Sequence, residues 1–93
     1  MIIFYNKKTG QIVGNIGGRY HSSHMDMWIG DKEETDRLII DWRPANDENG
    51  AIIEGKLVCN YPNEKLALAL EENPIMLHNY KVDLEKKELV PNG

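Results

Sequence analysis

Residues 2–16 read IIFYNKKTGQIVGNI, and this stretch decides how the chain begins to fold. Strand-forming side chains at 2–5 are followed by polar turn residues at 6–10, and a second strand returns at 11–16. Gly10 can take the positive φ that a type I turn followed by a bulge requires. The pattern therefore predicts a β-hairpin at this end of the chain.

A second hairpin is predicted near the other end. Residues 75–84 favour a strand, 85–87 a turn and 88–90 the returning strand. The segment NKKTGQIV at 6–13 aligns with DLEKKELV at 83–90, because each begins with an Asx residue and ends with a polar residue and two aliphatic residues. Convergence on a favoured turn is the preferred explanation, because a duplication would normally extend beyond eight residues; duplication stays open as the alternative.

The middle of the chain predicts a third hairpin. Alternating side chains favour a strand over 37–43, which Pro44 closes. Residues 46–50 end in Asn-Gly, a strong signal for a tight turn, and 51–60 predict the returning strand. Gly55 within that strand indicates a bulge.

A short helix is expected before this third hairpin. Ser23 and Asp26 have a spacing related to the capping box, so they predict a helix over 24–29 that ends at Gly30. The charged residues 31–36 that follow are expected to form a solvated loop facing a partner.

The segment 63–72 has two interpretations. Its strong helix formers, with Pro62 before them and Asn73-Pro74 after them, favour a helix. The leucines at 66, 68 and 70 alternate as they do in a strand, so the strand interpretation stays open. The packed face of the helix is expected to contain Leu66, Ala69, Leu70 and Asn73.

Together these segments predict one α+β domain over residues 1–93. We expect an antiparallel sheet of five or six strands from sequential hairpins, with one or two short helices packed on one face. Hydrophobic residues make up 41% of the chain and charged residues 28%, which is typical of a globular protein. A chain of 93 residues buries a modest core, so its stability margin is expected to be thin.

Charge and cysteine content narrow the function classes. The 11 Lys and Arg and 15 Asp and Glu give a net charge of −4, which argues against nucleic-acid binding and is compatible with a basic protein partner. The single cysteine, Cys59, excludes an internal disulfide and suits a reducing compartment. We expect neither a secretory signal nor a membrane span, because residues 1–8 lack a basic region followed by a long apolar run and the apolar runs of the chain are short. A cytoplasmic protein, or a virion protein assembled there, is expected.

Candidate chemistry is sparse. His21, His24 and Asp26 form the metal-like cluster, although His21 precedes the predicted helix and only His78 remains as a further histidine ligand. Surface histidines beside a helix N-terminus are the favoured explanation of the cluster. Cys59 lies in an apolar strand, where cysteine usually acts as a small hydrophobic residue. We therefore predict no catalytic residues, no metal and no cofactor.

Aromatic residues next to arginine mark the candidate interface. Trp42-Arg43 and Arg19-Tyr20 combine the residue types that are enriched at interface hot spots. Trp28 is expected in the core, whereas Trp42 suits the core and an interface equally. Exposed edges of the terminal hairpins could also pair with a neighbouring subunit.

The segments FYNKKTGQIVGNIGGRYH, MWIGDKEE, RLIIDWRP and YKVDLEKKELV resemble small phage and metagenomic proteins of uncharacterised function. The resemblance implies a virion or phage-accessory context. The sequence thus favours a non-enzymatic binding or structural module that acts through a protein–protein interface. Two alternatives stay open: an acidic inhibitor of a basic, nucleic-acid-binding protein, and a metal protein or enzyme that uses His21, His24 and Asp26.

Overall fold

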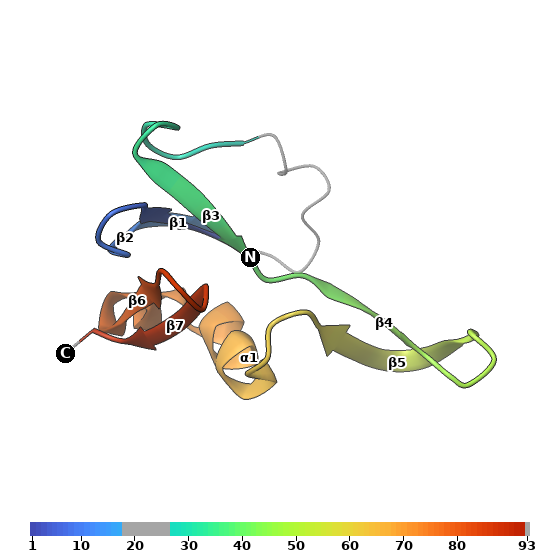
Figure 1. Ribbon diagram of the computed structural model, residues 1–93. Coiled ribbons are helices and arrows are strands. Elements are labelled where there is room, and N and C mark those ends of the chain that lie inside the picture. Colours follow the sequence, from blue (N-terminus) through green and yellow to red (C-terminus); the bar gives the residue numbers. More distant parts are fainter. Residues whose placement is uncertain (18–26, 93) are drawn as a thin grey trace.

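The computed structural model describes residues 1–17 and 27–92, which form seven strands, one α-helix and one 3₁₀-helix (Figure 1). The strands are β1 (Ile2–Asn6), β2 (Ile12–Ile16), β3 (Thr35–Ile39), β4 (Trp42–Asn46), β5 (Ile52–Cys59), β6 (Tyr80–Asp83) and β7 (Glu88–Pro91). The helices are α1 (Glu64–Glu72) and the 3₁₀-helix η1 (Pro74–Asn79). All strand pairs are antiparallel, so the α+β class is confirmed. The expected single sheet of five or six strands is wrong, because the seven strands divide into three small sheets, ordered β2-β1-β3, β4-β5 and β6-β7.

Strand β1 occupies the centre of the three-stranded sheet. It pairs with β2 along one edge and with β3 along the other. Ile2, Ile3, Phe4 and Tyr5 are all buried, because both faces of the strand are covered. Ile3 and Tyr5 face the main core, whereas Phe4 lies in a cross-strand row between Gly14 and Arg37.

Residues Trp28 and Ile29 cover this second face. The ring of Trp28 packs edge-on against Phe4 at 5.8 Å, and the Arg37 guanidinium lies 4.7 Å from the centre of the Trp28 ring. The Trp28 Nε1 donates a hydrogen bond to Thr35 Oγ1 at 2.8 Å. Gly14 leaves room for Ile29, since a Cβ there would come within 3.0 Å of the Ile29 side chain.

This packing corrects the prediction of a helix over 24–29. Residues 27–29 are not helical, and the side chains of Trp28 and Ile29 pack against the sheet. Ser23 and residues 24–26 fall outside the described residues. The charged loop predicted at 31–36 ends at Glu34, because Thr35 begins β3 and is buried.

The core joins all three sheets and both helices. Its buried members come from Met1 and β1, the β3–β4 connection, the base of β4, and the chain that follows β5. They are Met1, Ile3, Tyr5, Ile40, Trp42, Tyr61, Ala67, Leu70, Leu77, Val82 and Leu89.

The two end hairpins use the same turn. Asn6 Oδ1 accepts hydrogen bonds from the N–H groups of Lys8 and Thr9, at 2.8 and 3.2 Å. Asp83 Oδ1 accepts from the two equivalent N–H groups of the other turn, each at 3.0 Å. The fifth position has positive φ in both turns, 78° at Gly10 and 56° at Lys87. The sequence match therefore reflects a shared turn geometry, which convergence and duplication both still explain.

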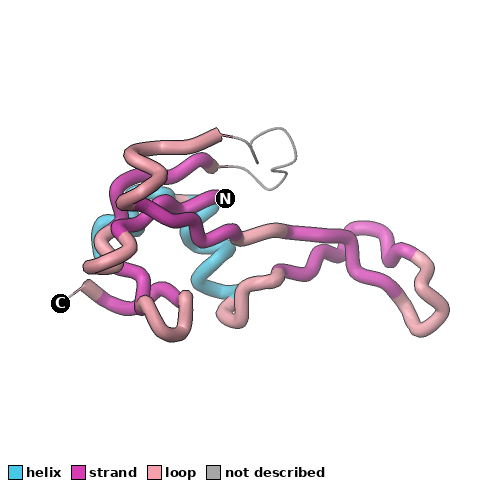
Figure 2. The backbone as a smooth tube through the Cα atoms, turned by 45° about the horizontal axis from the view of Figure 1, so that its top comes forward, coloured by secondary structure: helices cyan, strands magenta, loops and turns pink. Residues whose placement is uncertain are grey.

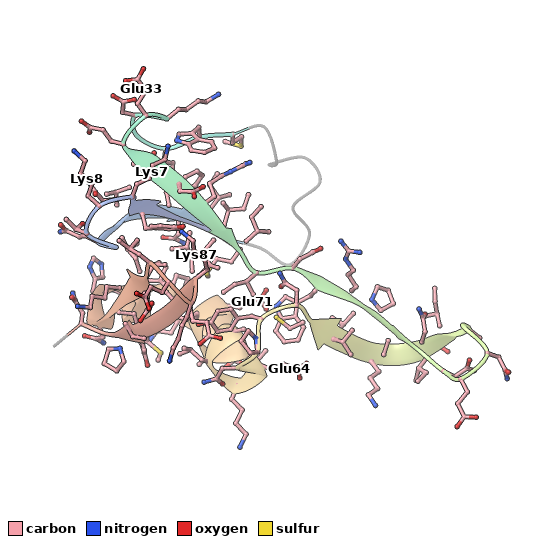
Figure 3. All side chains as sticks on the ribbon, in the orientation of Figure 1. Lys7, Lys8, Glu33, Glu64, Glu71 and Lys87 are labelled. Atoms are coloured by element: carbon pink, nitrogen blue, oxygen red, sulfur yellow. The ribbon has the colours of Figure 1, made fainter. Side chains whose placement is uncertain are left out.

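These two hairpins also contact each other. The Val82 N–H donates to the Gly10 carbonyl at 2.8 Å. Lys87, which projects toward the first hairpin (Figure 3), donates from Nζ to the Tyr5 hydroxyl at 3.2 Å. The terminal hairpins therefore lock the two ends of the chain together.

The helix predicted over 63–72 is confirmed, and the strand alternative is wrong. Asn63 is the N-cap, and its Oδ1 accepts a hydrogen bond from the Leu66 N–H at 3.1 Å. Ala67 and Leu70 are buried, whereas Asn73, expected on the packed face, is exposed. The buried face is therefore rotated from the predicted one.

The strand predicted over 75–84 is wrong in its first half. Residues 74–79 form η1, and β6 begins only at Tyr80. Pro74 suits the first turn of a helix, because its fixed φ is helical and its missing N–H has no helical partner. This tight turn directs Leu77 into the core.

The Gly10–Val82 contact is expected to be sensitive to a single methyl group. A Cβ on Gly10 would lie 2.0 Å from the Val82 carbonyl oxygen, so Gly10→Ala adds a clash to the cost of positive φ. We expect a loss of about 2 kcal/mol or more in unfolding free energy by urea denaturation. Gly50→Ala is the matched control, since Gly50 has a similar φ of 81° and no neighbour within 4 Å. Equal losses in the two variants would contradict this account.

Candidate protein-interaction surface

Strands β4 and β5 form a hairpin that extends away from the rest of the fold (Figures 1 and 2). We call residues 42–59 the β4–β5 arm. The arm helps to make the molecule elongated, with principal extents of 43, 29 and 24 Å. A two-stranded hairpin on its own is at best marginally stable in water. The base of the arm therefore has to be anchored in the core.

Trp42 and Asn60 provide this anchor. Trp42 is only 8% exposed and belongs to the core. The Asn60 Oδ1 accepts from the Asp41 N–H at 2.6 Å, and its Nδ2 donates to the Ile39 carbonyl at 2.9 Å. These bonds tie the strand leaving the arm to the chain entering it.

The strand predicted over 37–43 is divided in the structure. β3 ends at Ile39 and β4 begins at Trp42, and β4 continues through Pro44 instead of ending there. The Asn60 N–H donates to the Asp41 carbonyl, so Asp41 and Asn60 form a hydrogen-bonded pair. Hydrogen-bonded and non-hydrogen-bonded pairs alternate along an antiparallel ladder, so the backbone groups of Pro44, three residues after Asp41, face away from β5. Pro44 is tolerated because its nitrogen lies on the free edge, where no ladder bond is lost.

The returning strand contains the predicted bulge. Pro44 pairs with Leu57 and Asn46 with Ile52, so two residue steps along β4 match five steps along β5. Gly55 accommodates the extra residues with a φ of 76°. The proline on one edge and the bulge on the other leave the arm without a long regular edge for strand pairing.

The turn at the tip of the arm is held by one carboxylate. Asp47 Oδ1 accepts from the N–H groups of Asn49 and Ala51 at 2.8 and 3.0 Å. Gly50 takes the positive φ that this turn requires. The tip is therefore formed by local interactions, without support from the core.

Beyond its base the arm exposes aliphatic side chains to solvent. Ile52 is 69% exposed, Val58 43% and Ile53 37%. We call these three residues the arm patch. Glu54 and Lys56 lie between them and are also exposed. The combination of aliphatic and oppositely charged side chains on a projecting element is suited to a protein contact.

Of the predicted interface residues that the structure describes, Trp42 is buried and Arg43 is exposed. Trp42 lies in the core, so its aromatic ring offers little surface to a partner. Arg43 is exposed and pairs with Asp41, with 3.0 Å between Nε and Oδ2. Arg19 and Tyr20 fall outside the described residues.

The arm patch was missed by the sequence interpretation. Apolar side chains at adjacent positions, Ile52-Ile53 and Leu57-Val58, place aliphatic groups on both faces of one strand. That pattern is the signal that would have identified it, since a hairpin strand with one face on the core needs only one apolar face.

The described residues contain no group of three or more His, Cys, Asp or Glu side chains placed to hold a metal ion. His21, His24 and Asp26 fall outside that part of the chain. Burial raises the pKa of the Cys59 thiol, and the neighbouring carboxylates of Glu64 and Glu71, labelled in Figure 3, raise it further. A hydrogen bond from the Tyr61 N–H to the sulfur lowers this pKa, but by less than the other effects raise it. The neutral thiol is a poor nucleophile.

Comparisons of the chain with protein-family models, with curated proteins and with solved structures found no match. Within residues 1–17 and 27–92, no helix is both long enough and apolar enough to cross a membrane.

Tyr61, directly after the arm, gives a pH-dependent prediction. Its hydroxyl accepts a buried hydrogen bond from the Leu89 N–H at 2.6 Å, and burial raises its pKa above the usual value despite that bond. Tyr61→Phe leaves the N–H without its acceptor, so we expect a loss of about 1–3 kcal/mol in unfolding free energy at neutral pH.

The same variant fixes the sign of the pH effect. The pKa of Tyr61 is higher in the folded state than in the unfolded state. The stabilisation of the fold by the Tyr61 hydroxyl is therefore complete below the unfolded-state pKa and is lost as pH rises through the folded-state pKa. The difference between wild type and Tyr61→Phe in urea unfolding should shrink above about pH 10. A difference that stays constant with pH would contradict the assignment.

Proposed function

We propose that this protein is a non-enzymatic binding or structural module and that the β4–β5 arm makes its protein contact. The observation that carries the proposal is the exposure of the arm patch on an element that projects from the fold. Aliphatic side chains in this position gain free energy only when another surface covers them.

The terminal hairpins support an interface less well than expected. Strand β1 is paired along both edges, so the first hairpin offers only β2 as a free edge. The turn beside β2 is already bonded to β6 through Gly10 and Val82. The arm is the better candidate, because side chains on it remain free for contact even though its edges are interrupted.

The size of the arm patch limits the strength of a single contact. The three exposed fractions together amount to about one and a half aliphatic side chains, which are worth roughly 2–4 kcal/mol when buried. Association costs about 4–15 kcal/mol in lost translational and rotational freedom. A lasting complex therefore needs either further contacts or repeated use of the patch.

The alternative of an acidic inhibitor receives less support. It requires carboxylates gathered on one surface, as a mimic of nucleic acid. Among the described residues, the exposed carboxylates instead lie on the turn before β3, the tip of the arm, strand β5, helix α1 and the β6–β7 turn: Asp31, Glu33, Glu34, Asp47, Glu48, Glu54, Glu64, Glu72 and Glu85.

The proposal is tested with a matched pair of isoleucines. Ile52 on the arm is 69% exposed and Ile75 on η1 is 68% exposed. We expect Ile52→Asp with Val58→Asp to weaken association at least about tenfold, and Ile75→Asp to leave it unchanged. The measurement is light scattering over a concentration series, together with retention of partner proteins on each immobilised variant. Association that survives the arm variant, or is lost equally in the control, would show that the arm is not the contact.

A further inference from the structure

We infer that Asn49, in the turn at the tip of the β4–β5 arm, is a site of spontaneous modification, at which the side-chain amide reacts with the backbone nitrogen of Gly50 in the folded protein. The reaction uses water and needs no enzyme or partner. The inference therefore goes beyond the proposed function and does not depend on it.

The chemistry is an exchange of amides within one chain. The Gly50 nitrogen gives its proton to water and attacks the side-chain carbonyl carbon Cγ of Asn49; the new N–Cγ bond closes a five-membered ring, and ammonia leaves. Water then opens the ring at either of its carbonyls, which gives aspartate or isoaspartate at position 49. The sum consumes one water, releases one ammonia and turns one amide into a carboxylic acid, without oxidation or reduction. The reacting atoms are neighbours in the chain, and such proximity favours the attack strongly.

The tip of the arm leaves this attack unhindered. Asn49 and Gly50 are both exposed, and the turn that joins β4 to β5 lies at the far end of the arm from the rest of the fold (Figures 1 and 2). Gly50 has no side chain beside the attacking nitrogen, and a Cβ placed on it would meet no atom within 4 Å. The ring can therefore form and take up water without displacing another side chain.

One hydrogen bond restrains the attacking nitrogen. The Gly50 N–H donates to the Asp47 carbonyl at 3.1 Å, and it has to leave that oxygen before it can react with Asn49. The N–H of Asp47 donates to the Ala51 carbonyl, and its Oδ1 accepts from the N–H groups of Asn49 and Ala51. All of these bonds lie within residues 47–51, so the tip can open while the core stays folded.

This local restraint sets the expected rate. Breaking one exposed hydrogen bond lowers the reactive population by about tenfold at most. Protection by the whole fold would lower it by about a thousandfold or more, because opening would then cost the full stability of the domain. We therefore expect Asn49 to react in the folded protein no more than about tenfold slower than in the urea-unfolded chain.

The product alters the arm at its most exposed point. A carboxylate at position 49 adds one negative charge beside Asp47 and Glu48, so the modified protein separates from the original by ion exchange. Isoaspartate also lengthens the backbone by one carbon atom, between the two N–H groups that the Asp47 Oδ1 holds. The geometry of the turn therefore changes permanently.

Peptide mass spectrometry during incubation at mildly alkaline pH tests the inference, with folded and urea-unfolded protein side by side. Asn49→Gln should lose the modified peptide, because its longer side chain has to close a less favourable six-membered ring. Asn46 is the control within the chain, since it is exposed at the end of β4 but precedes Asp47, whose side chain hinders the attack. Asn92 precedes Gly93, which falls outside the described residues, and its peptide is scored separately.

Aspartate and isoaspartate together at position 49, formed within about tenfold of the unfolded rate and absent from Asn49→Gln, would support the inference. Isoaspartate is the decisive product, because direct hydrolysis of the side chain gives aspartate alone. Aspartate without isoaspartate, slowing by more than about tenfold, or equal modification of Asn46 would each overturn it. None of these readouts measures association, so they leave the proposed function to its own test.

Discussion

Strand β1 has both edges hydrogen-bonded and both faces covered, and the rest of the structure is arranged around this burial. Its four large side chains, Ile2 to Tyr5, contribute roughly 6–12 kcal/mol of hydrophobic free energy. The net stability of a whole domain is only about 5–15 kcal/mol. Trp28 on one face of β1, and the β6–β7 hairpin and helix α1 in the core on the other, therefore serve one requirement, which is to keep water from this strand.

Local structure followed from local sequence wherever a turn residue had a direct backbone role. Asn6, Gly10 and Gly55 were assigned correctly, because an Asx side chain or a positive φ acts within a few residues. The errors arose where distant contacts decide. Trp28 and Ile29 pack against the sheet instead of belonging to a helix, and 75–79 form a tight turn that buries Leu77.

In the candidate site, too, the features that depend on distant contacts were not predicted from the sequence. Residue types alone favoured Trp42 as an interface residue, but the core uses its ring to anchor the arm. Whether Ile52 is exposed depends on how far the hairpin projects, and the sequence contains no direct measure of that. The arm patch emerges only when the third hairpin forms a sheet separate from the other two.

The bond from Val82 to Gly10 has a consequence for the order in which the protein folds during synthesis. The first hairpin leaves the ribosome well before β6 and β7, which complete its surroundings. Closing contacts so far apart in the chain is slow, and apolar surface stays open meanwhile. The nascent chain must therefore hold an incomplete core until β7 has been made, a period in which it is exposed to chaperones and to aggregation.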